Sequence, residues 1–125
     1  MNYTGVIIEE SLEDKDFLDS VKILNTKIEK VNERHQTPWI KQWTLHTVEV
    51  AEGKADEVAE KISKALDSKH DWYADFKNDT IDFIIFKNKV FKIDRTDQKQ
   101  YAKVRAYGIS LGIPEYQVGF KKRGK

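Results

Sequence analysis

The stretch WTLHTVEVAEGKADEVAEKISKAL, residues 43–66, decides the fold because two different periodicities meet in it. Up to Val50 it is rich in β-branched residues with apolar side chains on both alternating faces, which is typical of a central β-strand. Beyond Lys54 the apolar residues follow the i, i+3, i+4, i+7 spacing of an amphipathic helix. They are Ala55, Val58, Ala59, Ile62, Ala65 and Leu66. We therefore expect a strand over residues 43–50 and a helix over residues 54–66.

Three short segments after this helix predict an antiparallel meander. They cover residues 72–77, 80–86 and 90–94. Asn78-Asp79 separates the first two segments and Asn88 separates the last two, and both residue types favour tight turns. The short connections mean that consecutive strands should pair with each other.

A second helix is predicted over residues 97–111, where the residues of one stripe can face a core. This stripe consists of Tyr101, Val104, Gly108 and Leu111. Thr96 is the expected N-cap, and Gly112 is placed for the left-handed residue that commonly ends a helix. Residues 115–120 could then add an edge strand or pack as coil.

The N-terminal part has weaker patterns. We expect a strand over residues 3–9 and a short helix over residues 12–20. In residues 21–31 the apolar side chains keep no single period, which favours a strand with a bulge and leaves a helix as the alternative. Residues 32–38 end in Thr37-Pro38 and predict a loop, because proline disfavours helical backbone in the residue before it.

Together these elements predict an α+β fold with strands and helices in a ferredoxin-like order. Each helix has one apolar stripe to bury, so we expect a two-layer sandwich with an antiparallel sheet and both main helices on one face. Ile84 and Phe86 would then lie on the uncovered face. No repeat or linker divides the chain, so residues 1–120 should form one domain, followed by a basic flexible tail over residues 121–125.

Composition excludes several classes of function. The chain has 125 residues, enough for one core, and no cysteine for a disulfide, a thiolate nucleophile or a zinc-thiolate site. A net charge of +1 provides no general attraction to nucleic acid or anionic membranes. The longest apolar run, residues 83–86, is far too short to span a bilayer. We expect a cytoplasmic protein without membrane association.

An aromatic and polar set forms the candidate ligand-binding site. Its members are Trp39, Trp43, His46, Trp72, Tyr73 and Asp75. They could wall a pocket if the loop before Trp43 folds over the start of the strand at Trp72. The alternative is that tryptophan and tyrosine simply anchor a small core. His46 could act as a general base oriented by Asp75 or Glu49, or it could be a packed strand residue.

Other motifs for chemistry are weak. His35, His46 and His70 lack the short spacing of metal ligands, and the acids between Glu9 and Asp19 are interpreted as a solvated helix start. No metal and no cofactor are expected. A basic cluster at the C-terminus could contact phosphates, and it makes nucleic-acid binding the third functional alternative. It consists of Lys121, Lys122, Arg123 and Lys125.

Three segments resemble those of a family of small microbial proteins of uncharacterised function. They are TPWIKQWTLHTV (residues 37–48), WYADFKN (residues 72–78) and YGISLGIP (residues 107–114). The resemblance spans most of the chain and implies a free-standing prokaryotic protein. It implies no activity, cofactor or catalytic residue for these positions.

The sequence therefore favours a small cytoplasmic module that binds a ligand or another protein and self-associates as a homodimer through a sheet edge or face. The second hypothesis is a small enzyme that uses His46 with a carboxylate on a small molecule. Binding of nucleic acid through the basic tail is the least favoured of the three.

Overall fold

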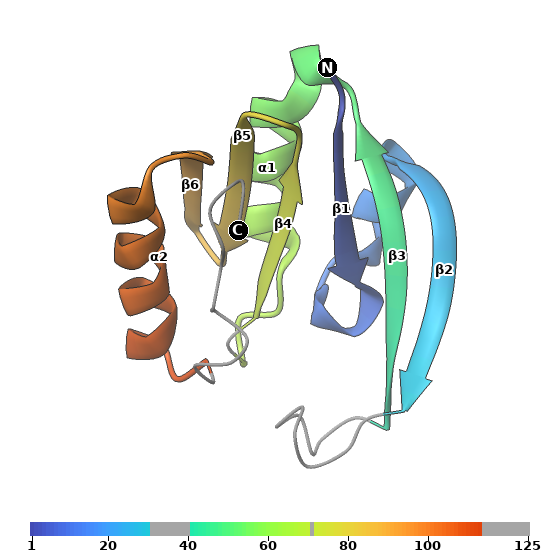
Figure 1. The fold of residues 1–125 in the computed structure, drawn as a ribbon. Helices are drawn as coiled ribbons and strands as arrows, with labels where there is room; N and C mark the ends of the chain where they lie inside the picture. The colour runs from blue at the N-terminus through green and yellow to red at the C-terminus, as the bar shows by residue number, and fades with distance from the viewer. Residues whose placement is uncertain (31–40, 71, 114–125) are drawn as a thin grey trace.

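A six-stranded antiparallel sheet and two main helices form the protein, which confirms the α+β class (Figure 1). The computed structural model describes residues 1–30, 41–70 and 72–113. The strands are β1 (Tyr3–Ile8), β2 (Lys22–Lys30), β3 (Gln42–Val50), β4 (Tyr73–Lys77), β5 (Ile81–Phe86) and β6 (Lys89–Asp94). The helices are α1 (Ala55–Ala65) and α2 (Gln98–Ser110). Short 3₁₀ helices cover Glu9–Ser11, Lys15–Ser20 and Glu52–Lys54.

The strands lie in the order β2-β3-β1-β4-β5-β6, so β1 is in the middle of the sheet although it comes first in the chain. It pairs antiparallel with β3 on one side and with β4 on the other. Strands β3 and β4 are therefore parallel to each other, and β3-α1-β4 is a βαβ unit split by an inserted strand. The predicted meander is confirmed by the antiparallel pairs β4 with β5 and β5 with β6.

The N-terminal predictions are confirmed for the strands and wrong for the helix. Strand β2 has the expected bulge, where its register on β3 shifts between Ile23 and Asn25. The helix expected over residues 12–20 is instead the 3₁₀ segment Lys15–Ser20, where the Asp14 side chain accepts a hydrogen bond from the backbone N–H of Asp16. The loop expected over residues 32–38 lies wholly outside the described residues.

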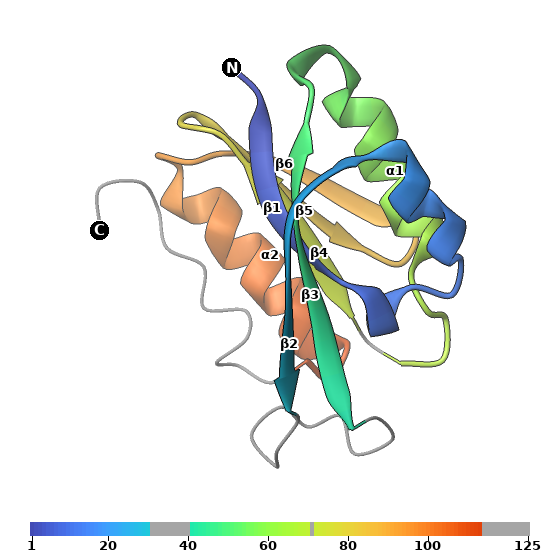
Figure 2. The ribbon, with the colours of Figure 1, turned by 90° about the vertical axis from the view of Figure 1, so that its right-hand side faces the viewer.

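The two helices lie on opposite faces of the sheet, as Figure 2 shows with the strands seen edge-on between them. Phe83 and Ile85 of β5 belong to the core under α1, whereas Ile84 and Phe86 belong to a second core under α2. The prediction that both helices share one face, leaving the second face bare, is therefore wrong. Because β5 is apolar on both faces, both of its faces have to be buried, and one helix packs on each.

Helix α2 begins one residue later than predicted. Asp97 is its N-cap, and the carboxylate accepts hydrogen bonds from the N–H groups of Lys99 at 3.0 Å and Gln100 at 3.2 Å. Thr96 instead donates its hydroxyl to Asp94. The helix stop is confirmed, because Gly112 has a φ of 98°. No helix within the described ranges is long and apolar enough to cross a membrane.

Helix α2 covers only the β4-β5-β6 half of the sheet face on which it packs. The second core holds side chains of β4, β5 and β6 and none of β1 or β3. Val6, in the middle of β1, is accordingly 44% exposed on the α2 side. A strip of open sheet is thus left beside α2.

Candidate functional site

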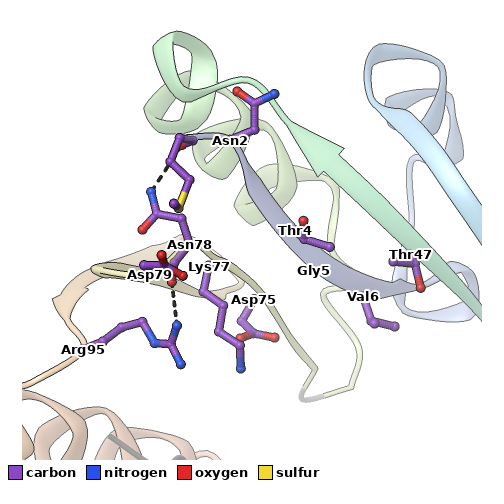
Figure 3. A pocket seen from close by; sticks show the side chains of 11 residues that line it. Asn2, Thr4, Gly5, Val6, Thr47, Asp75, Lys77, Asn78, Asp79 and Arg95 are labelled. Carbon is purple, nitrogen blue, oxygen red and sulfur yellow. Dashed lines mark hydrogen bonds between the residues drawn. The ribbon is translucent and has the colours of Figure 1, made fainter. Parts of the chain in front are cut away.

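A pocket of about 500 Å³ opens on this strip of sheet beside the start of α2 (Figure 3). Strand pairing explains why side chains from three strands meet there. Val6 is paired with Thr47 on β3 and with Asp75 on β4, and paired residues project from the same face. Lys77 projects alongside Asp75 because it is two residues further along β4. Arg95, which follows β6, completes the wall opposite β1.

Asp75, which lines the pocket, forms a carboxyl pair with Asp82. Asp75 is opposite Ile84 on β5, which makes Asp82 its diagonal neighbour on the same face. Asp82 is buried, with 3% of its surface exposed. Its Oδ2 accepts a hydrogen bond from the Tyr101 hydroxyl at 3.1 Å, whereas its Oδ1 has no donor in the described part of the chain.

Burial and mutual repulsion change how these carboxyls titrate. Burial, followed by the negative charge of Asp75, raises the pKa of Asp82 to about 7. Burial also raises the pKa of Asp75, against the opposing positive charges of Lys77 and Arg95. The folded protein therefore holds a proton on this pair at a higher pH than an isolated aspartate would.

The groups around the pair are mainly donors. Burial and the charge of Asp82 raise the pKa of Tyr101 to about 12, so its hydroxyl remains protonated throughout the neutral range. Arg95 donates from Nη1 to the carbonyl oxygen of Asn78 at 2.6 Å. The Nε of Arg95 is buried and has no partner among the described residues. The pocket thus combines two cationic side chains with one partly protonated carboxyl pair.

His46 lies on the other face of the sheet. It is paired with Ile7, which neighbours Val6 along β1 and therefore projects away from the pocket. The predicted pairing of His46 with Asp75 or Glu49 is wrong, because both carboxylates lie on the opposite face. The carboxylate that does contact His46 is Glu9, with Oε1 at 2.9 Å from Nε2.

The His46 ring is held from both sides and is only 7% exposed. Its Nδ1 lies 2.9 Å from the Thr26 hydroxyl of β2, opposite the contact with Glu9. The neighbouring Glu10 accepts hydrogen bonds from the N–H and hydroxyl of Thr44 at 2.6 and 2.8 Å. These contacts tie the 3₁₀ segment after β1 to the β2-β3 hairpin. Glu9 and Glu10 are therefore structural anchors, in contrast to the expected solvated helix start. The other four acids, Glu13, Asp14, Asp16 and Asp19, are exposed at the 3₁₀ helix Lys15–Ser20, as expected.

We predict that His46→Ala lowers the free energy of unfolding by about 2 kcal/mol, because Glu9 and Thr26 lose a buried partner. Urea unfolding followed by circular dichroism measures this change. Ligand binding in the pocket should remain unchanged within error. A loss of binding without loss of stability would show that His46 belongs to the functional site.

The described aromatic members of the candidate set are divided between two places. Trp43 and Trp72 pack edge to face with ring centroids 6.0 Å apart, and Trp72 is part of the first core. Tyr73 packs on Phe86 in the second core. Trp39 lies outside the described residues, as does the basic tail. Of the five predicted site residues that the structure describes, Asp75 is the one that lines the pocket.

Sequence reasoning missed Asp82 and Arg95. For Asp82 a signal was present, because it is the single acid in the otherwise apolar strand IDFIIF, residues 81–86. Arg95 had no such signal, since its place depends on distant backbone contacts: its N–H donates to the carbonyl oxygen of Thr80 and its Nη1 to that of Asn78. Among the described residues no group of three or more histidine, aspartate or glutamate side chains is arranged to hold a metal ion.

Comparisons of the chain with protein-family models, curated proteins and solved structures find no match. The resemblance to small microbial proteins of uncharacterised function stays a prediction. The functional argument therefore depends on the geometry of the pocket.

Proposed function

We propose that this protein is a small cytoplasmic ligand-binding module whose site is the pocket beside α2. The observation that carries the proposal is the concentration of polar groups at Asp75, Lys77 and Arg95, on a sheet face that is mainly apolar where α2 covers it. Purely structural charges are normally satisfied by each other or by solvent. Within the described ranges, the buried Nε of Arg95 has no partner, and it lies beside the Asp75-Asp82 carboxyl pair.

The chemistry of the lining defines the class of ligand. Lys77 and Arg95 would bind a carboxylate, for which the planar guanidinium is the better-matched partner. Asp75, at the centre of the floor, would accept a hydrogen bond from an amine or hydroxyl. Thr4 and Thr47 add further hydroxyl groups on the β1 side. The ligand that fits this arrangement is a small amino or hydroxy acid.

The proposal predicts that a panel of amino acids and small hydroxy acids contains at least one compound that raises the melting temperature and binds in isothermal titration. Lys77→Met should weaken that binding roughly tenfold, as expected for the loss of one charged contact. Lys99→Met is the matched control, because Lys99 is an exposed lysine on α2 outside the pocket lining. Failure of every compound at about 10 mM would reject the proposed ligand class.

A second measurement locates the site directly. Protein purified from its source, crystallised without additives that contain carboxylates, should show ligand density between Asp75 and Arg95. Density elsewhere, for instance at the Trp43-Trp72 pair, would contradict the assignment of the pocket while leaving a binding function in place.

A further inference from the structure

Strand β2 is a long, exposed edge strand of the sheet. It is nine residues long, carries no proline and is exposed along almost all of its length. Three of the six exposed large apolar side chains in the described part of the chain belong to it, namely Ile23, Leu24 and Ile28, and Ile28 is 62% exposed. Natural sheet edges are usually short, charged, bulged or covered, because a bare edge can pair with another chain.

The opposite edge of the sheet is protected. Strand β6 is packed by α1 and by α2, which approach it from the two faces. Lysines do not distinguish the two edges, because β6 exposes Lys89 and Lys92 and β2 exposes Lys22, Lys27 and Lys30. Among the described elements, β2 makes extensive contacts with β3 alone. The edge at β2 is therefore the one available for association.

The bulge limits which part of β2 can pair regularly. Its register on β3 is interrupted between Ile23 and Asn25 and is continuous from there to Lys30. A bulge bends the strand and leaves a residue out of the ladder, so it commonly ends a paired region. A second strand would accordingly add along the part beyond the bulge.

The sequence of this part is complementary to itself in one register. Two copies of β2 that pair antiparallel are related by a two-fold axis perpendicular to the sheet. Because paired residues project from the same face, this axis lies between the two copies of one residue, and we call it an axis through that residue. An axis through Lys27 would place two lysines directly opposite each other. An axis through Thr26 would place Lys22 opposite Lys30 and would include the bulge. Both arrangements oppose like charges, which destabilises a pair.

An axis through Ile28 has neither fault. It places Ile28 of one copy opposite Ile28 of the other. Lys27 of each copy then lies opposite Glu29 of the other copy. Thr26 then lies opposite Lys30. The most exposed apolar side chain of the strand is buried at the centre, and opposite charges meet on the other face.

We propose that two copies of this chain form a homodimer through antiparallel pairing of β2 with β2, centred on Ile28, so that their sheets become continuous. The partner is identified by the self-complementary order Lys27-Ile28-Glu29. The edge is short compared with stable interfaces, so a dissociation constant on the order of 10–100 μM is expected. The pocket lies across β1 and β4, and the dimer does not depend on the proposed ligand.

A charge-exchange experiment tests this register. Sedimentation velocity of the full chain at increasing concentration should show a dimer for the natural protein. Glu29→Lys should weaken dimerisation roughly tenfold or more, because each Lys27 then faces a lysine. The double substitution Lys27→Glu with Glu29→Lys restores opposite charges and should restore the dimer. Ile28→Lys should give a monomer.

Two controls separate the edge from general surface effects. Lys61→Glu changes an exposed charge on α1, and Ile109→Lys removes an exposed apolar side chain on α2. Both should leave the dimer intact, and circular dichroism should show that every variant is folded. A natural protein that stays monomeric at about 1 mM overturns the proposal. So does a dimer that tolerates Ile28→Lys, or a double variant that fails to recover.

Discussion

Gly5→Ala is expected to destabilise the fold by on the order of 3–5 kcal/mol, which is at the upper end for a single methyl group. Gly5 lies at the centre of β1, where β1 and β4 pair. A Cβ atom added there would lie 2.0 Å from the carbonyl oxygen of Asp75 and 2.6 Å from the Cα of Phe76. Both are backbone atoms, so no side-chain rotation can relieve the overlap. The two strands would have to move apart.

The matched control is Gly53→Ala, since a Cβ at Gly53 would meet no atom within 4 Å. It should leave the free energy of unfolding unchanged within about 0.5 kcal/mol. Chemical denaturation of the two variants in parallel measures the difference. A Gly5→Ala protein as stable as Gly53→Ala would mean that β1 and β4 are not paired in the register described.

Much of the fold could be predicted because the signals were local. The helix at Ala55–Ala65, the meander and even the bulge in β2 follow from spacing within short segments. The error over the two faces has a different origin. The run from Phe83 to Phe86 showed that β5 is apolar on both faces, but helix stripes alone do not tell which face each helix covers. The apolar run of β5 indicates that both faces of the sheet must be buried, so one helix has to pack on each face.

The site was less predictable because it depends on contacts between distant segments. His46 receives its carboxylate from Glu9, which is 37 residues away and follows a different strand. Register decided this, because His46 pairs with Ile7 and Asp75 pairs with the adjacent Val6, which places the two side chains on opposite faces. Residue type identified candidates correctly as polar or aromatic, but only pairing and register could place them on a face.

The carboxyl pair should make stability depend on pH in the direction opposite to most acidic groups. The pKa of Asp82 is raised from the ordinary value of 3.8 to about 7, so the folded state holds a proton that the unfolded state releases. The contribution of this proton to the free energy of unfolding is therefore fully present below about pH 4 and is lost as the pH rises towards 7. Asp67 and Asp94 have lowered pKa values, so their contribution has the opposite sign and is confined to acidic pH.

Asp82→Asn isolates this effect. An amide can accept the hydrogen bond from Tyr101 and donate one to Asp75 without a titrating proton, so the variant should not lose this contribution as the pH rises. We expect the unfolding free energy of Asp82→Asn minus that of the natural protein to increase by about 2–3 kcal/mol between pH 5 and pH 8. Urea unfolding at intervals across this range measures the difference.

Asp79→Asn provides the comparison, because Asp79 is exposed in the turn between β4 and β5. Its difference curve should be flat. A flat curve for Asp82→Asn as well would mean that Asp75 and Asp82 are both ionised and separately solvated at pH 7. The pocket would then hold a fixed double negative charge, which would oppose an acidic ligand and would count against the amino or hydroxy acid that we propose.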